Sequence, residues 1–170
     1  MSPIFVCPLS SLNETLKTTG ARWLVSLSGP GKPVPEGGSI ITSHLKLCFN
    51  DIAEPREALI EPNRDHISQL LSFGRSWAGD GPLLVHCWMG ISRSTAACLI
   101  LAAQTNPGGD MIKLAQILRK KSPMATPNSL MIKLADDALN LDGRLIEAVS
   151  QIGRGADASE GLPFFMEVDA

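Results

Sequence analysis

The sequence predicts a single α/β domain, with a mostly parallel central sheet flanked by helices on both faces. The first observation is a pair of short apolar runs, residues 23–27 and 82–87, which have the composition of strands buried on both faces. The second is that segments with apolar residues at helical spacing separate the expected strands, an alternation typical of parallel sheets. A chain of 170 residues can bury one core of this kind.

The first half of the chain predicts three strands and one helix. Residues 4–9 form the first strand, and a short helix over 11–19 ends at Gly20. The run 23–27 is the second strand, and a Gly/Pro-rich surface loop follows from 29 to 38. Residues 44–49 alternate between apolar and polar, which predicts a third strand. A loop that contains a turn of helix is expected from 50 to 62.

The second half predicts one strand and several helices. Asn63 is in position to cap a helix that continues to Trp77. The run 82–87 is the fourth strand, and a helix follows at once, from about 92 to 104. Further helices are expected over 110–121, over 130–138 and, after the Asp142-Gly143 pair, up to residue 152. We therefore expect a folded domain over 1–152 and an acidic, mobile tail over 153–170. The alternative for the tail is that its apolar residues Leu162, Phe164 and Phe165 dock it on the core.

The composition indicates a globular protein and excludes some partners. Hydrophobic residues make up 44% of the chain and charged residues 19%, and the net charge is only -2. Such a charge gives no general attraction to nucleic acid or to anionic membranes. The longest apolar run, 96–103, is far shorter than the roughly 20 residues that a membrane helix needs. The first residues lack the features of a signal peptide, and we expect a cytoplasmic protein with neither nucleic acid nor membrane as a partner.

The cysteines divide into three that resemble core residues and one that does not. Cys7, Cys48 and Cys98 have apolar neighbours, as is usual for buried free cysteine. The chain contains no Cys-x-x-Cys pair, and its histidines add no ligand spacing, so neither a metal site nor a disulfide framework is predicted. Cys87 differs because it lies where a buried strand ends and a helix follows.

The segment between Cys87 and Arg93 predicts a loop that binds an anion. The apolar pattern of the strand ends at Cys87, and the pattern of the following helix begins by Ser94. The chain must therefore turn tightly in between, and Gly90 supplies the required backbone freedom. Successive N–H groups converge in such a loop, and the following helix adds its positive end. The main chain of five residues is then expected to cradle a phosphate group: Trp88, Met89, Gly90, Ile91 and Ser92.

The side chains around this loop predict phosphoryl transfer to sulfur. At the base of the cradle, Cys87 is expected to be a thiolate that attacks phosphorus. Arg93 can bind two phosphate oxygens with its planar guanidinium, a geometry that lysine cannot reproduce. Ser94 can donate its hydroxyl to the sulfur when the phosphocysteine breaks down. His86, inside the strand, is expected to order the loop through hydrogen bonds and not to transfer protons.

The nine residues from His86 to Ser94 match the signature His-Cys-x-x-Gly-x-Ser-Arg-Ser. At these residues the chain resembles the cysteine-based protein tyrosine phosphatase superfamily, most closely its compact dual-specificity branch. A weaker resemblance covers about residues 4–139 and includes Pro127-Asn128 before a late helix. The resemblance implies hydrolysis of phosphoprotein monoesters, either on phosphotyrosine alone or also on phosphoserine and phosphothreonine, with no cofactor or metal. The chain departs from the pattern at Met89, where the branch usually has alanine, and at Leu134, where it has glutamine. It is also too short to hold both the Trp-Pro-Asp loop and the phosphotyrosine-recognition loop of the larger enzymes.

The departing oxygen needs a proton, and several carboxyl groups are candidates for the general acid. Asp80 begins the strand that Cys87 ends, which places it about 20 Å away at roughly 3.3 Å per residue. Asp65 lies at a helix start, where a carboxylate interacts favourably with the helix dipole. Asp51 follows the third strand and shares an edge with the loop if that strand is parallel to the one ending at Cys87. The resemblance also implies an acid in this loop, so Asp51 is the predicted acid, with Asp65 and Glu54 as alternatives.

Two other functions remain open at this point. One is a phospho-binding adaptor without turnover, against which the presence of Cys87, Arg93 and Asp51 argues. The other is a phosphatase for a non-protein substrate, such as an inositol lipid or an RNA end. Lipid-directed relatives tend to carry basic residues inside the loop, and its side chains here are uncharged. Cys48, expected near Asp51, is a candidate resolving partner if Cys87 is oxidised to sulfenic acid.

Overall fold

The computed structural model describes residues 2–168, which contain a five-stranded sheet and six α-helices. The strands are β1 (Ser2–Pro8), β2 (Trp23–Ser28), β3 (Ser43–Cys48), β4 (Leu83–Cys87) and β5 (Phe164–Val168). Their order in the sheet is β3-β2-β4-β1-β5. Strands β1 to β4 are parallel to their neighbours, and only β5 is antiparallel, to β1. The predicted fold class is therefore confirmed.

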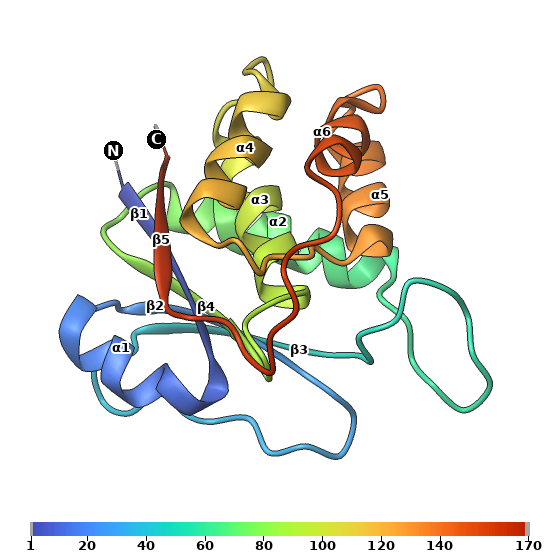
Figure 1. Ribbon diagram of the computed structural model, residues 1–170. Coiled ribbons are helices and arrows are strands. Elements are labelled where there is room, and N and C mark those ends of the chain that lie inside the picture. Colours follow the sequence, from blue (N-terminus) through green and yellow to red (C-terminus); the bar gives the residue numbers. More distant parts are fainter. Residues whose placement is uncertain (1, 169–170) are drawn as a thin grey trace.

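Helices cover both faces of the sheet, as Figure 1 shows. One face carries the short 3-10 helix η1 (Leu9–Ser11) and α1 (Leu12–Thr19). The other face carries α2 (Arg64–Trp77), α3 (Arg93–Thr105), α4 (Met111–Lys121), α5 (Ser129–Ala138) and α6 (Arg144–Ile152). No helix within residues 2–168 is long and apolar enough to cross a lipid bilayer.

Strand β4 and helix α3 form the centre of the molecule. All five residues of β4 are buried, because the strand lies between β2 and β1 and is covered on both faces. Its side chains alternate, with Leu84 in the small core under α1 and Leu83 and Val85 in the large core under the other helices. Helix α3 is buried from Arg93 to Ala103, since the sheet lies on one side of it and other helices surround the rest. The loop between β4 and α3 is thus held by two rigid elements.

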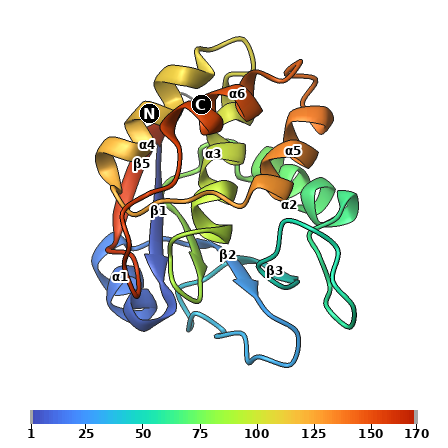
Figure 2. The ribbon, with the colours of Figure 1, turned by 45° about the vertical axis from the view of Figure 1, so that its right-hand side comes forward.

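Two sequence-based expectations are wrong. Residues 153–170 were expected to be a mobile tail, with docking by Leu162, Phe164 and Phe165 as the alternative. Phe164–Val168 pair with β1 as strand β5, so the tail is docked through Phe164, whereas Leu162 is exposed. The side chains of Phe164, Met166 and Val168 are buried, so the strand extends the large core and covers an edge of β1 that would otherwise be open. Figure 2 shows the chain running from α6 along the molecule and back as β5. The loop over 50–62, as described by the structure, contains turns and bends but no turn of helix.

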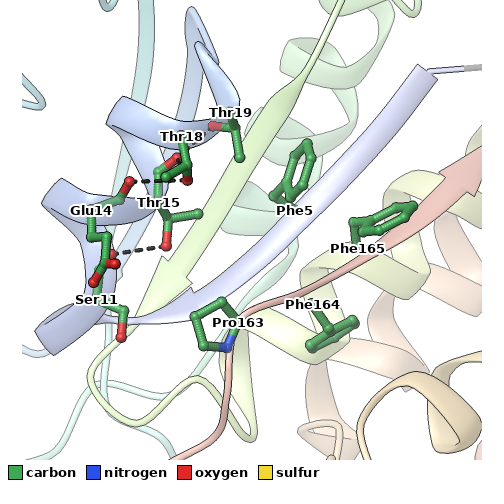
Figure 3. A pocket seen from close by; sticks show the side chains of 9 residues that line it. All are labelled: Phe5, Ser11, Glu14, Thr15, Thr18, Thr19, Pro163, Phe164 and Phe165. Carbon is green, nitrogen blue, oxygen red and sulfur yellow. Dashed lines mark hydrogen bonds between the residues drawn. The ribbon is translucent and has the colours of Figure 1, made fainter.

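Helix α1 does not reach β5, which leaves a hollow between them (Figure 3). Its volume is about 430 Å³. Aromatic side chains of the sheet face the hydroxyl groups of α1 across it, and its lining consists of Phe5, Ser11, Glu14, Thr15, Thr18, Thr19, Pro163, Phe164 and Phe165. None of these residues belongs to the loop between β4 and α3, so this hollow is separate from the site described next.

Candidate active site

The four parallel strands end at the same edge of the sheet, with Pro8, Ser28, Cys48 and Cys87 as their last residues. Ligands of open parallel sheets bind outside this edge. Cys87 is the last residue of β4 and is 2% exposed, and α3 begins six positions later at Arg93. The Cys87 thiol therefore lies at the edge of the sheet where open parallel sheets usually bind their ligands.

The sulfur of Cys87 has two polar groups within hydrogen-bond distance. The Gly90 N–H donates to Cys87 Sγ at 3.2 Å, and the Ser94 hydroxyl lies 3.1 Å from the same sulfur. Burial raises the pKa of Cys7 to about 12, and it raises the pKa of Cys98 to about 12 as well, so both stay protonated at neutral pH. At Cys87, by contrast, the Gly90 N–H and the N-terminal end of α3 are directed toward the sulfur.

The main chain of the loop over 87–93 is held from outside by its carbonyl groups. Four of them accept N–H hydrogen bonds from other segments: Leu9 donates to Trp88 (3.2 Å), Gly161 to Met89 (2.7 Å), Thr126 to Ile91 (2.9 Å) and Asn128 to Ser92 (3.3 Å). In a trans peptide the carbonyl and the following N–H point in opposite directions. The N–H groups that follow these carbonyls, those of Met89, Gly90, Ser92 and Arg93, are therefore directed to the inside of the loop. Several main-chain N–H groups that point into one loop are suited to hold an anion.

Gly90 is required in this loop for two reasons. Its φ is +68°, in the left-handed region that favours glycine. A Cβ atom there would lie 2.7 Å from the nitrogen of Pro8, at the end of β1. The loop thus packs directly on the neighbouring strand, which fixes the Gly90 N–H on the sulfur.

Arg93 extends from the start of α3 toward the segment that follows β3. It is 7% exposed, and its Nη1 donates to the carbonyl of Phe49 at 2.8 Å. Its Nε is buried and has no hydrogen-bond partner among residues 2–168. A buried, unpaired guanidinium N–H beside a cradle of amides is suited to a phosphate oxygen.

Asp51 lies beside the loop, as predicted from the end of its strand. Its Oδ1 accepts from the Ser92 hydroxyl at 2.8 Å and from Asn128 Nδ2 at 2.9 Å. The two alternatives lie elsewhere in the described chain: Asp65 is in the first turn of α2, and Glu54 is exposed with no hydrogen bond to the loop. Asp80 accepts from Trp23 Nε1 at 3.3 Å at the opposite end of the sheet, which agrees with its rejection on distance.

Asn128 has a role that the sequence did not reveal. It is 5% exposed and caps α5, accepting from the Met131 N–H at 3.0 Å. Its Nδ2 also donates to the carbonyl of Ile52 at 3.1 Å, so a single side chain connects α5 with the segment that carries Asp51. The Pro127-Asn128 pair was visible as part of the family resemblance, but its contact with Asp51 joins positions 77 residues apart.

His86 is hydrogen-bonded behind the loop and stays neutral. Ser26 Oγ lies 2.6 Å from His86 Nε2 and 2.8 Å from His44 Nε2, which forms a chain across three strands. Burial lowers the pKa of His86 to about 4, although the main chain of Cys87 opposes this shift. The ring therefore carries no charge at neutral pH. Sequence reasoning did not predict the contacts with Ser26 and His44.

The mouth of the site is a small hollow of about 130 Å³ over Cys87 and Arg93. One wall comes from the loop after β2, with Lys32, Pro33 and Pro35, and the other includes the Trp88 side chain, which is 58% exposed. The ammonium group of Lys32 lies 5.9 Å from the centre of a Trp88 ring. Trp88 is thus a wall of the mouth, while the cradle itself is made by the main chain.

Cys48 was expected to be a core residue and was a candidate resolving partner for Cys87. Its side chain is exposed and not part of the core. It ends β3, and β2 lies between β3 and β4, so Cys48 is two strands away from Cys87. Two interstrand spacings of about 4.8 Å exceed the Cα–Cα separation that a disulfide spans. A direct disulfide between Cys48 and Cys87 therefore requires a rearrangement of the sheet edge.

Comparison with known proteins places the fold. Neither a family model nor a curated protein matches the sequence. Among solved structures, the chain is similar to human DUSP28 (19% identity, 87% of this chain and 94% of that chain covered, TM-score 0.61). It is also similar to DUSP15 (18%, 88% and 89%, TM-score 0.62) and to a human tyrosine phosphatase-like serine/threonine/tyrosine-interacting protein (18%, 82% and 92%, TM-score 0.64). The chain therefore has the fold of the cysteine-based phosphatases of the dual-specificity class, and the resemblance read from the sequence is confirmed at the level of fold.

Proposed function

We propose that this protein hydrolyses phosphomonoesters through a phosphocysteine at Cys87, and that its substrates are phosphorylated proteins or peptides. The observation that carries this proposal is the position of Cys87 Sγ, which receives the Gly90 N–H at the base of a loop with inward-directed amides. The buried guanidinium of Arg93 beside the same loop supplies the positive charge that the transferred phosphoryl group needs. The cytoplasm stays the predicted location.

The proposed reaction has two steps. In the first, the Cys87 thiolate attacks phosphorus, the ester P–O bond breaks, and protonated Asp51 gives its proton to the departing oxygen. In the second, water attacks the phosphocysteine, the S–P bond breaks, and the Asp51 carboxylate accepts the proton of the water. Ser94, 3.1 Å from the sulfur, donates to the thiolate as it leaves. Arg93 and the loop amides bind the phosphoryl oxygens throughout, and no metal ion takes part in these steps.

Phosphotyrosine is the substrate that the mouth of the site supports best. The exposed Trp88 ring and the Pro33–Pro35 side form apolar walls for an aromatic ring above Cys87. The side chains of residues 88–92 carry no charge, and Lys32 and Arg93 are the two cations at the mouth, fewer than a polyphosphorylated inositol headgroup calls for. The side chains of phosphoserine and phosphothreonine are shorter than that of phosphotyrosine, so peptides that carry them serve as the comparison substrates.

Binding without turnover is the second candidate. One protein with a similar structure is named a tyrosine phosphatase-like serine/threonine/tyrosine-interacting protein, and this name describes an interaction. In the present chain, Cys87, Arg93 and Asp51 all occupy the site, and Asp51 is hydrogen-bonded to the loop itself. A complete set of nucleophile, anion ligand and acid favours turnover over binding.

An activity panel with phosphoenzyme trapping tests the proposal. The purified chain is assayed on peptides with phosphotyrosine, phosphoserine or phosphothreonine, on phosphoinositide vesicles and on 5′-phosphorylated RNA. We expect turnover on the phosphotyrosine peptide, a phosphoenzyme on sulfur that can be trapped by rapid denaturation, and loss of both in Cys87→Ser with phosphate binding retained. Activity that survives in Cys87→Ser contradicts the mechanism. Tight binding of the phosphopeptide by the native chain without any hydrolysis supports the adaptor.

A further inference from the structure

The C-terminal segment over 153–163 contacts the loop that carries the nucleophile. Its residue Gly161 donates its N–H to the carbonyl of Met89 at 2.7 Å. In Figure 1 the chain between α6 and β5 meets the end of the loop that follows β4. We propose that Gly161 is a positioning residue for the nucleophile, and that this segment is part of the active site. The inference deepens the proposed function, since it concerns the same sulfur, but it can be tested without turnover.

The contact acts on a particular peptide of the loop. The carbonyl of Met89 and the N–H of Gly90 belong to the same trans peptide, so they point in opposite directions. On one side this peptide accepts from Gly161 at 2.7 Å, and on the other side it donates to Cys87 Sγ at 3.2 Å. Rotating the peptide breaks both hydrogen bonds together. Gly161 therefore holds the donor of the sulfur in place, although it lies outside the loop.

The contact is too close for any other residue. Gly161 is buried, and a Cβ atom on it would lie 2.7 Å from the carbonyl oxygen of Gly90. Two glycines thus face each other where the C-terminal segment crosses the loop. The neighbouring Leu162 side chain, by contrast, is 69% exposed, and a substitution there leaves this crossing unchanged.

The start of the segment is fixed by Arg119 on α4. Its Nη1 donates to the carbonyls of Pro123 and Ala125 at 2.6 and 2.9 Å. Its Nη2 donates to the carbonyls of Ile152 and Gly153 at 3.2 and 2.7 Å. The guanidinium therefore joins the end of α6 to the segment before α5, which also supplies the Thr126 N–H to the loop.

The middle and the end of the segment are fixed by further contacts. The Gly155 N–H donates to Thr126 Oγ1 at 3.1 Å, and the Ala156 N–H donates to the carbonyl of Pro123 at 2.9 Å. The Ser10 hydroxyl donates to Glu160 at 2.9 Å, and Phe164 then enters β5 opposite Val6. With both of its ends held, the segment has little freedom to move Gly161 away from the loop.

The first experiment replaces the donor and measures the sulfur directly. Gly161→Pro removes the N–H that the Met89 carbonyl accepts, but it also adds a Cβ atom at the close crossing. Gly161→Ala adds the same Cβ and keeps the N–H, so it is the matched control, and the loss in Gly161→Pro should exceed the loss in Gly161→Ala. Leu162→Ala is a second control on the next residue. We expect Gly161→Pro to slow alkylation of Cys87 by iodoacetamide at neutral pH about tenfold and to weaken binding of orthovanadate about tenfold. Leu162→Ala should match the native chain in both. A folded Gly161→Pro, judged by its thermal melt, with native alkylation and native vanadate binding overturns the inference.

The second experiment uses the native chain, in case Gly161→Pro does not fold. Amide hydrogen exchange is followed by NMR at Gly161 and at Leu162, with and without orthovanadate. We expect the Gly161 amide to be protected and to exchange more slowly when vanadate fills the cradle, because ligand binding orders the peptide that accepts from it. Exchange at Gly161 as fast as in an unfolded peptide, or unchanged by bound vanadate, overturns the inference. A chain that hydrolyses no phosphate ester but shows these couplings contradicts the proposed function and leaves the inference intact.

Discussion

Cys87 and Asp51 lie at the same edge of the sheet, but they are held there by different means. Cys87 is 2% exposed, and its contacts with Gly90 and Ser94 come from residues next to it in the chain. Asp51 is exposed, and its partners Ser92 and Asn128 come from distant parts of the sequence. The nucleophile is therefore a local structure between one strand and one helix, whereas the acid depends on how several segments assemble.

This difference divides the site into a local half around Cys87 and an assembled half around Asp51, and it suggests how each half responds to substitutions. A local, buried arrangement is altered only by substitutions within it or directly behind it. An assembled, exposed arrangement can be loosened from several places, each with a partial effect, because the remaining contacts still hold the residue near its position. Arg93 belongs to both halves, since it follows the loop and donates to the carbonyl of Phe49, two residues before Asp51.

The largest effect among these predictions is expected at Arg93. Arg93→Lys keeps a positive charge but loses the planar pair of donors and the contact with Phe49. We expect kcat/KM on a phosphotyrosine peptide to fall on the order of 10³-fold, with vanadate binding weakened as well. The matched control is Arg22→Lys, whose guanidinium lies 3.8 Å from Asp80 at the opposite end of the sheet. If Arg93→Lys keeps the native kcat/KM, a positive charge is enough to bind the phosphoryl group, and the planar guanidinium is not required.

Asp51 is expected to matter most for the departing oxygen. Asp51→Asn should lower kcat on a phosphotyrosine peptide on the order of 10²-fold and lower it clearly less on a nitrophenyl phosphate, whose leaving group needs little protonation. KM should change little, because Arg93 and the loop amides make the binding contacts. Asp65→Asn and Glu54→Gln are the controls, and both should behave like the native chain. An equal loss on both substrates in Asp51→Asn contradicts proton donation by Asp51 to the departing oxygen.

The sequence predicted the local half of the site better than the assembled half. Cys87, Gly90, Arg93 and Ser94 lie within eight positions, so a strand, a tight loop and a helix are enough to bring them together. Asp51 was predicted because the ends of parallel strands share an edge. Neither step requires knowledge of which distant segments pack on each other.

The contacts that were missed depend on long-range packing. Asn128 reaches Asp51 only because α5 packs beside α3 and α2. Strand β5 was hidden by the Gly, Ser and acidic residues of 153–163, although the alternation of Phe164, Met166 and Val168 was a readable signal. Without β5, nothing in the sequence indicates that Gly161 lies on the loop.

A smaller effect is expected at Asn128, which holds the acid without touching the substrate. Asn128→Ala should lower kcat on the phosphotyrosine peptide about tenfold and, like Asp51→Asn, should spare the nitrophenyl phosphate. Because both substitutions act on the same proton transfer, Asn128→Ala should add little to Asp51→Asn in the double variant. Ser92→Ala removes the other donor to Asp51 Oδ1 and tests the same point from the loop side. Fully additive losses mean that Asn128 supports α5 and not the acid.

The smallest effect concerns stability and comes from the buried half, at His86. Burial lowers the pKa of this ring to about 4 in the folded chain, against 6.5 as its ordinary value. Between these values the unfolded chain binds a proton that the folded chain does not, so the free energy of unfolding falls as the pH drops from 6.5 toward 4. From pH 7 to 5.5 this amounts to about 1 kcal/mol. His44, Arg93 and the Cys87 main chain face the ring, and they act on its charged form.

Urea unfolding at pH 7 and pH 5.5 tests this expectation. On acidification, the free energy of unfolding of His86→Gln should fall by about 1 kcal/mol less than that of the native chain. His44→Gln, which can still donate to Ser26, should keep most of the native fall. The same pH dependence in His86→Gln and in the native chain means that the ring is not held neutral, and that the strand behind the nucleophile is open to solvent protons.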